Sequence, residues 1–333
     1  MKRAGGWALG LLIVGTLAGG GWFAFDRIYN RKTVAVICLW GDKSDGPTAE
    51  ATRRGAAFAL EEAGERAGRF RVILRNIVRS PSSEIFGVVY LGTTAAIQVR
   101  GLPTTDHYSI ATFDTRALGP AADLCITPEC GRQGRSAAVW AKKEKADRVF
   151  LLRDKPHLRS EVIADVFERS ARSLELEVEG VLDTSVELPT LIDRVLASRA
   201  DLVFYSGEEA PYGTATKIFT ALRDKGYAGT LVTGEADPEV SYLATRPRLV
   251  EGMYLVSPFA PAPPDLVSRM GNPVPGPHVT AGYYAMKAAL DVIDRANSVE
   301  PAELRRAAAG LETRPCALYV ARNGRFEFVE LLK

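Results

Sequence analysis

The side chains of this sequence that suit a small polar molecule are hydroxyls, one carboxylate and a few aromatic rings in or beside short loops. They are Thr93, Thr94, Thr115, Tyr212, Glu235 and Tyr283. Hydroxyls and loop amides bind a carboxylate, and an acidic side chain binds an ammonium group, so the set has the chemistry of amino-acid recognition. Taken one at a time, the threonines also fit helix caps and turns, and Glu235 in TGEAD also fits a solvated acid before a helix.

The sequence contains no standard catalytic or metal-binding signature. The loop WGDKSDG after the first apolar run lacks the GxGxxG of a dinucleotide site, and no GxxxxGK[ST], GxSxG or HExxH occurs. The three histidines, His107, His157 and His278, lie far apart, and no pair has the spacing of metal ligands. A Ser/His/Asp triad stays open, because its members need only meet in space. The sequence therefore predicts neither a metal nor a cofactor, and it favours a binding protein over an enzyme.

An alternation of strands and helices must position these loops. Strands are expected at residues 33–40, 71–78, 108–113, 148–153, 176–183, 201–207 and 229–234, and helices at 49–68, 132–144, 160–175, 188–199 and 213–226. This order is typical of an α/β protein with parallel sheets covered by helices on both faces. About five strands fall on each side of Leu124, which predicts two doubly wound lobes. Ligands of such sheets bind outside the carboxyl ends of the strands, which is where the polar loops fall.

One further helix is predicted between Gly276 and Ser298. Its apolar residues recur at helical spacing, and they are Val279, Tyr283, Met286, Leu290 and Ile293. The helix begins with His278 and Thr280 beside glycine and proline, a polar start that packing alone does not need.

The stretch NIVRSPSSEIFGVVYLG does not fit a regular α/β crossover. A parallel crossover needs roughly ten or more residues, and only SPSSE separates the two apolar runs. Either a helix is missing and the first lobe is shortened, which we favour, or Ile85 to Leu91 belongs to a helix that starts at Ser80.

Residues 1–32 read as a membrane-targeting segment. The uncharged run from Ala4 to Phe25 has roughly 22 residues, enough at ~1.5 Å per residue to cross the hydrocarbon layer. Lys2 and Arg3 precede it, as in a secretory signal, and small residues near Ala18 would permit cleavage. The apolar run continues through Phe25, which favours an uncleaved anchor over a cleaved signal. Because Arg27, Arg31 and Lys32 weaken the charge asymmetry, the expected periplasmic or other extracytoplasmic location of the remainder rests on the segments that follow.

Composition and cysteine content add further limits. The chain has 333 residues and a net charge of +2, and no basic stripe with interleaved aromatic residues predicts nucleic-acid binding. Cys125 and Cys130 in CITPEC form either a local disulfide, which export would permit, or two thiols, or part of a thiolate metal site with Cys38 and Cys316. Cys38 on the first strand fits a small buried apolar residue.

Five sequence blocks carry a family resemblance: Val34 to Glu62, QGRSAAVWA, ADLVFYSG with TALRDKGYAGTLVTGEAD, EGMYLVSPFAP, and GPHVTAGYYAMKAALDVIDRA. Their order resembles the type I periplasmic solute-binding proteins of the branched-chain amino acid transporter family. The resemblance implies two doubly wound lobes joined by a three-strand hinge, with lobe 1 at 33–123 plus 256–313 and lobe 2 at 124–255 plus 314–333. It also implies a non-enzymatic role, in which the protein binds an amino acid or amide and delivers it to an ABC permease or presents it to a membrane sensor partner.

The resemblance assigns roles to the polar residues of the second lobe and of the loop after residues 108–113. Glu235 stands where the family places the acid that pairs with the ligand ammonium, and Tyr212 stands at the aromatic residue after the preceding strand. Thr115 stands at the hydroxyl of the lobe 1 binding loop, and Phe113 at a residue there that contributes its backbone.

The neighbouring loop and the last helix complete the implied site. Thr93 or Thr94 in LGTTA takes the place of a serine, and His278 and Tyr283 lie where the helix begins at the mouth of the cleft.

The chain also departs from the family pattern. Leu158 stands where the family usually has a tyrosine, WGDKSDG replaces the usual GPxxG, and Asp114 adds a charge to a loop that is normally neutral. These departures leave a second hypothesis open, a ligand sensor or a degenerate member that binds no ligand and serves as an interaction module. An enzyme on a doubly wound fold is a third.

Overall fold

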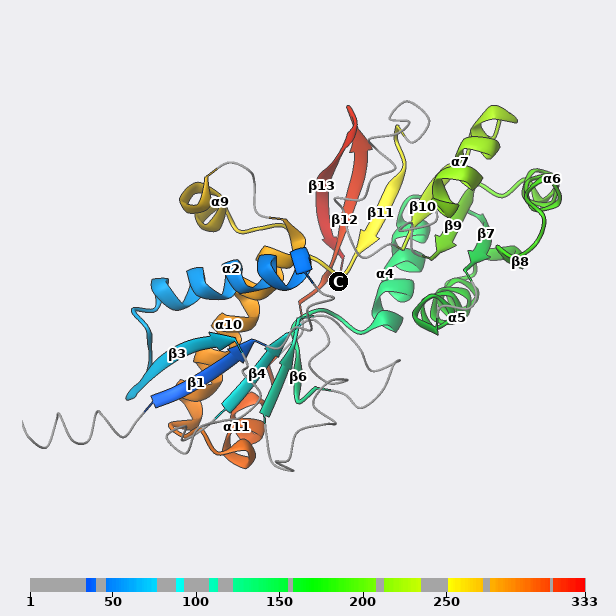
Figure 1. Cartoon of the computed structure of the whole chain (residues 1–333). Helices are drawn as coiled ribbons and strands as arrows, with labels where there is room; N and C mark the ends of the chain where they lie inside the picture. Colours follow the sequence, from blue (N-terminus) through cyan, green and yellow to red (C-terminus); the bar gives the residue numbers. More distant parts are fainter. Residues whose placement is uncertain are drawn as a thin grey trace, which may run out of the picture.

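A computed structural model of the chain describes most of it as two β-sheets with covering helices (Figure 1). The described residues are 34–39, 46–76, 88–92, 108–112, 122–154, 158–207, 213–234, 251–271, 276–311 and 314–332.

Sheet A contains the early strands in the order β2-β3-β1-β4-β5-β6. Their bounds are β1 (Val34–Leu39), β2 (Arg66–Ala67), β3 (Phe70–Asn76), β4 (Val88–Gly92), β5 (Tyr108–Ala111) and β6 (Leu124–Cys125). The pairs from β3 through to β6 are parallel, and only β2 runs antiparallel, against β3. The expectation of a parallel α/β sheet is therefore confirmed.

Strand β4 tests the hypothesis that Ile85 to Leu91 belong to a helix that starts at Ser80. Residues 77–87 lie outside the described ranges, so the favoured shortening of the first lobe stays a prediction. In register, Ile37 of β1 lies opposite Val89, and Leu91 of β4 lies opposite Ile110 of β5. Val88 to Leu91 are thus a central strand, and the alternative that Ile85 to Leu91 continue a helix is wrong. The apolar run Val-Val-Tyr-Leu suits a strand with neighbours on both sides, whereas a helix would need polar residues on one face.

Helices α2 (Gly46–Glu62), α10 (Pro277–Ala296) and α11 (Pro301–Ala308) pack on sheet A, and α9 (Pro264–Met270) joins the same core through Leu266. The predicted apolar stripe of α10 is buried at all five positions. Helices α2 and α10 cross at small residues, because a side chain at Gly55 would collide with the carbonyl of Val279 and one at Gly282 with the carbonyl of Thr52. The predicted last helix is confirmed, and glycine permits its close approach to α2.

Sheet B contains the later strands in the order β13-β12-β11-β10-β9-β7-β8. Their bounds are β7 (Arg148–Arg153), β8 (Glu177–Asp183), β9 (Leu202–Ser206), β10 (Thr230–Thr233), β11 (Tyr254–Ser257), β12 (Cys316–Arg322) and β13 (Arg325–Leu332). Strands β8, β7, β9, β10 and β11 are parallel, whereas β12 and β13 form an antiparallel hairpin. The hairpin turns at Asn323 and Gly324, both with positive φ, as a tight two-residue turn requires.

Helices cover both faces of sheet B. They are α4 (Cys130–Lys143), α5 (Leu158–Ser173), α6 (Leu188–Ser198) and α7 (Thr214–Asp224). Val149 and Leu151 of β7 face the core under α4 and α5, and Phe150 and Leu152 face the core under α6 and α7. Burial on both faces explains why the strand reads as a continuous apolar run.

The chain passes between the two groups of elements three times. Strand β6 ends in sheet A, and α4 then packs on sheet B. Strand β11 ends in sheet B, and α10 then packs on sheet A. After α11 the chain returns to sheet B as β12. The two sheets are therefore each built from segments that are far apart in the sequence.

Candidate functional site

The residues that directly follow three neighbouring parallel strands lie together at the carboxyl edge of sheet B. Strands β7, β9 and β10 are neighbours and run in the same direction, so their carboxyl ends meet at one edge. Asp154 follows β7, Gly207 follows β9 and Gly234 follows β10. In open parallel sheets this edge is where ligands bind.

Asp154 is buried and links the carboxyl ends of β7, β8 and β9. Its Oδ1 accepts a hydrogen bond from Thr184 Oγ1 at 2.9 Å, and its Oδ2 accepts one from Tyr205 Oη at 3.3 Å. Its backbone N–H donates to the carbonyl of Ser206 at 2.9 Å. A side chain at Gly207 would collide with Tyr205 and Asp154, so glycine is required beside this carboxylate. Asp154 therefore fixes the backbone from which the next loop residues extend.

Gln133 and Arg159 brace the ends of β10 and β11 from the helix layer. Gln133 on α4 is 0% exposed, and its Nε2 donates to the carbonyl of Gly234 at 2.7 Å and to the carbonyl of Val256. Its Oε1 accepts from Nη2 of Arg159 at 2.7 Å, and Arg159, near the start of α5, is 7% exposed. Buried polar groups are costly unless they are hydrogen-bonded, so these bonds hold the strand ends at defined positions.

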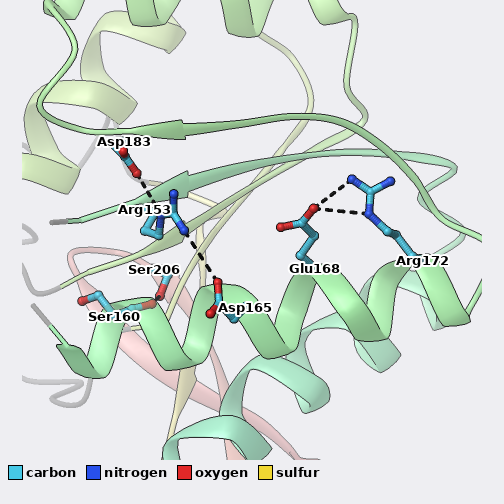
Figure 2. A network of polar contacts seen from close by, with 7 residues as sticks. All are labelled: Arg153, Ser160, Asp165, Glu168, Arg172, Asp183 and Ser206. Atoms are coloured by element: carbon cyan, nitrogen blue, oxygen red, sulfur yellow. Dashed lines mark hydrogen bonds and ion pairs between the residues drawn. The ribbon is translucent and has the colours of Figure 1, made fainter. Parts of the chain in front are cut away.

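A second set of contacts fixes α5 against the same edge (Figure 2). Ser206 Oγ donates to the carbonyl of Ser160 at 2.7 Å. Arg153 lies between two acids: its Nε donates to Asp183 Oδ1 at 2.8 Å, and its Nη1 lies 3.6 Å from Asp165 Oδ1. The hydrogen bond with Asp183 is the main cause that raises the pKa of Arg153. Helix α5 is thus fastened to the ends of β7, β8 and β9.

The start of α10 was predicted to line the site through His278 and Tyr283. The half-buried ring of His278 lies edge-on to Phe259, with centroids 5.5 Å apart. Thr280 is buried and donates from Oγ1 to the carbonyl of Gly276 at 3.0 Å, so its hydroxyl is used within the first turn. Tyr283 is five residues beyond His278, about 140° around the helix.

Tyr283 instead takes part in a contact between α10 and α2. Its hydroxyl donates to Glu62 Oε2 at 2.7 Å and accepts from Lys287 Nζ at 3.3 Å. Burial and the hydrogen bond with Glu62 raise the pKa of Tyr283 to about 12. The structure therefore does not bring Tyr283 and His278 to the same side of α10, and a ligand contact of either residue stays a prediction.

The other predicted ligand residues lie outside the described part of the chain. They are Thr93, Thr94, Phe113, Thr115, Tyr212 and Glu235. Their neighbours in the sequence are described, because Thr93 follows β4, Phe113 follows Thr112 at the end of β5, Tyr212 precedes Gly213 at the start of α7, and Glu235 follows Gly234. Each predicted residue thus lies close in the sequence to the end of a described strand or to the start of a described helix.

The sequence did not predict the braces at Gln133, Asp154 and Arg159. Gln133 lies in the block QGRSAAVWA, where a glutamine on the otherwise small and apolar inner face of a helix was the available signal. Asp154 directly follows the apolar run RVFLLR, and Arg159 lies in the segment that departs from the family pattern.

The predicted disulfide between Cys125 and Cys130 is not formed, and both residues are thiols. Cys125 ends β6 in sheet A, with Sγ 3.6 Å from Thr127 Oγ1. Cys130 begins α4 and is buried in the core of sheet B, so the two side chains belong to different surroundings. Within the described ranges, no group of three or more His, Cys, Asp or Glu side chains is placed to hold a metal ion.

Comparisons with known proteins give matches in structure but not in sequence. No family model and no curated protein sequence matches the chain. A putative branched-chain amino acid ABC transporter protein from Rhodospirillum rubrum matches in structure with a TM-score of 0.72, over 89% of this chain and 99% of its own, at 15% identity. The fold is that of the type I periplasmic binding proteins. The resemblance inferred from the sequence is thus confirmed at the level of the fold.

Other type I periplasmic binding proteins match to a similar extent. A leucine-binding protein from Thermotoga maritima has a TM-score of 0.66 at 17% identity and covers 90% of this chain and 99% of its own. A solute-binding protein from R. palustris in complex with benzoate has a TM-score of 0.59 at 13% identity and covers 90% and 96%. These similar structures are solute-binding proteins and not enzymes, and at such identities they establish the fold alone.

The predicted membrane segment, Ala4 to Phe25, lies outside the described residues. Of the helices that are described, none is both long enough and apolar enough to cross a membrane.

Proposed function

We propose that this chain is an extracytoplasmic solute-binding protein that closes on a small polar ligand, an amino acid or amide, for delivery to an ABC permease. The observation that carries the proposal is the threefold passage of the chain between sheets A and B. The passages are the short segments between Cys125 and Cys130, between Ser257 and Pro264, and between Ala308 and Cys316. Two α/β units joined by short segments suit hinge closure around a ligand.

The lobes of this proposal follow the boundaries expected from the sequence, with a small change. Lobe 1 comprises 33–123 plus 256–313, and lobe 2 comprises 124–255 plus 314–333. Strand β6 pairs with β5 of sheet A through Cys125, and β11 pairs with β10 of sheet B through Thr233 and extends to Ser257. These pairings support moving two of the boundaries by two residues each, from 123 to 125 and from 255 to 257.

Glu235 is the proposed partner of the ligand ammonium. The bracing of Gly234 supports this role, because Gln133 holds the Gly234 carbonyl and the Gly234 N–H donates to the carbonyl of Tyr205 at 2.9 Å. A charged group that follows a fixed residue is positioned before the ligand arrives, which lowers the cost of binding.

The remaining proposed contacts are assigned by chemistry. The hydroxyls of Thr93, Thr94 and Thr115 bind the ligand carboxylate, and the backbone of Phe113 contributes beside them. Tyr212 and His278 border the ligand.

The test begins with a thermal-shift screen of amino acids and amides, followed by calorimetric titration of any compound that raises the melting temperature. Glu235→Gln should weaken binding of an amino acid by about 10- to 100-fold, because a charge-assisted hydrogen bond contributes ~1.5–3 kcal/mol and each decade of affinity is ~1.4 kcal/mol. Glu144→Gln, at an exposed acid after α4, is the matched control and should bind like the parent.

Two results would count against the proposal. Equal affinity of Glu235→Gln and the parent would exclude the ammonium role, and Asp114 or Glu208 would be the next candidates. No binding of any amino acid or amide would favour the degenerate interaction module over a solute-binding protein.

The proposed location is outside the cytoplasm, on a membrane anchor formed by residues 4–25. Mass spectrometry of the exported protein should find the intact N-terminus. A mature chain that begins near Gly20 would show a cleaved signal instead.

A further inference from the structure

A cavity of about 590 Å³ lies where the three passages between the sheets meet α10. The first passage contributes Ile126 after β6, the second contributes Pro263, and the third contributes Leu311 and Arg314. None of the described residues at the carboxyl edge of sheet B lines it, and neither does His278. Its volume is within the range of about 300–1,000 Å³ that is typical of small-molecule sites.

Arg314 is a partly buried charged group of this cavity whose side chain contacts a tyrosine. Its guanidinium Cζ lies 3.0 Å from the ring centroid of Tyr284 on α10, and its backbone N–H donates to the carbonyl of Ile126 at 3.2 Å. Among the residues that the structure describes, no carboxylate forms an ion pair with it. Burial lowers its pKa, which indicates that the charged guanidinium has lost part of its hydration.

The other charged residues of the cavity are already paired in most cases. Glu62 accepts the Tyr283 hydrogen bond and lies 3.9 Å from Lys287 Nζ and 3.8 Å from Arg269 Nη1. Asp291 is paired with Arg295, four residues along α10, at 2.8 Å. Asp265 is exposed at the start of α9, where water screens its charge. The uncompensated and partly desolvated charge is therefore positive, which favours an anion.

Besides Cys125 and two tyrosines, the remaining lining is apolar, with Leu124, Ile126, Leu311, Pro263 and Ala288. A free inorganic anion would leave these surfaces in contact with water, whereas an organic molecule would cover them. Arginine is the side chain best suited to bind a carboxylate through two parallel hydrogen bonds.

We propose that this cavity is a second ligand site, which binds a small organic carboxylate through Arg314 with its apolar body against Leu124, Leu311 and Ala288. Apart from Tyr283, none of the described residues predicted for the amino-acid site lines this cavity. Its ligand touches segments from all three passages between the sheets.

The test titrates the full-length protein with benzoate, phenylacetate and hexanoate, and with benzamide as a neutral control, by calorimetry at millimolar concentrations. At least one carboxylate should bind, and benzamide should bind about 10-fold or more weakly than benzoate. Arg314→Gln should lower carboxylate affinity by about 10- to 100-fold, the range of a charge-assisted hydrogen bond. Arg306→Gln removes an exposed arginine on α11 that is paired with Glu303, and it should have no effect.

A second variant separates loss of binding from loss of folding. Ala288→Phe fills the cavity without removing any charge, and it should abolish carboxylate binding while the melting temperature stays near that of the parent. Binding that survives in both Arg314→Gln and Ala288→Phe would overturn the proposal, as would the failure of all three carboxylates to bind. A carboxylate affinity that is lost in Thr115→Ala but kept in Arg314→Gln would assign the ligand to the amino-acid site instead, which supports the proposed function and refutes this one.

Discussion

Replacing Gln133 by methionine tests whether the buried brace stabilises the carboxyl edge of sheet B. Methionine keeps the length of the side chain but has no amide, so it can pack in the same space. The carbonyls of Gly234 and Val256 would lose a donor, and Nη2 of Arg159 would lose an acceptor. Because Gln133 is 0% exposed, water cannot replace these bonds without a rearrangement of α4.

The expected loss follows from two of these bonds. A buried polar group left without its partner costs ~1–3 kcal/mol, so loss of the bond to Gly234 and of the bond to Arg159 should lower the free energy of unfolding by ~2–6 kcal/mol. The assay is urea unfolding followed by circular dichroism, in which the shift of the midpoint multiplied by the m-value gives the change. Arg172→Met is the control, because Arg172 on α5 forms an exposed pair with Glu168 and should change stability by less than about 0.5 kcal/mol.

A double variant tests whether Gln133 and Arg159 act as one unit. Both residues share a hydrogen bond of 2.7 Å, so the losses in Gln133→Met and Arg159→Met should not add, and the coupling energy should be ~0.5–3 kcal/mol. A Gln133→Met protein as stable as the parent would refute the stabilising role of the brace. Additive losses would refute the link between the two residues.

Three other outcomes are expected. Gly55→Ala should lower the free energy of unfolding by ~1–3 kcal/mol, because the new methyl group meets the Val279 carbonyl and must separate α2 from α10. Burial raises the pKa of Cys316 to about 12, so at pH 8 iodoacetamide should label it far more slowly than the partly exposed Cys125, and the difference should vanish in urea, as measured by peptide mass spectrometry. The pKa of Tyr283 is raised to about 12, so the stability that its protonated hydroxyl contributes is complete below pH ~10 and is lost as the pH rises from ~10 to 12. Tyr283→Phe should show a smaller loss of stability over this pH range, as measured by urea-unfolding midpoints at a series of pH values.

Most of the secondary structure could be predicted from the sequence because a buried strand or helix face has a local pattern of apolar residues. The runs RVFLLR and DLVFYSG are apolar on both faces, and they form β7 and β9 in the middle of a covered sheet. The stripe of α10 predicted a buried face, and all its members are buried. The helix considered from Ile85 to Leu91 was wrong, since an apolar run of that length fits a strand and a helix equally well until its neighbours are known.

The site was less predictable because its contacts join distant parts of the chain. Gln133 and Gly234 are 101 residues apart, and Glu62 and Tyr283 are 221 residues apart. A glutamine on an apolar helix face indicates a buried polar group, but it does not tell which distant carbonyls the amide binds. The short spacing of Cys125 and Cys130 left a disulfide and two thiols both open, because proximity in sequence does not place two thiols together when one ends a strand and the other begins a helix in a different core.

The brace at Gln133 and the proposed ammonium partner Glu235 are separated by a single residue, Gly234. Gly234 is held on both sides, since its N–H donates to Tyr205 and its carbonyl accepts from Gln133. A residue attached to such a fixed peptide loses little further conformational freedom when it binds a ligand. The entropy cost of binding is therefore smaller, and the affinity is higher.

Gln133→Met should then weaken amino-acid binding although Gln133 itself touches no ligand, whereas Arg172→Met should leave amino-acid binding unchanged. Because the cavity at Arg314 shares no residue with this brace, carboxylate binding at Arg314 should be equal in the two variants. A Gln133→Met protein that binds both kinds of ligand as the parent does would mean that the brace serves stability alone.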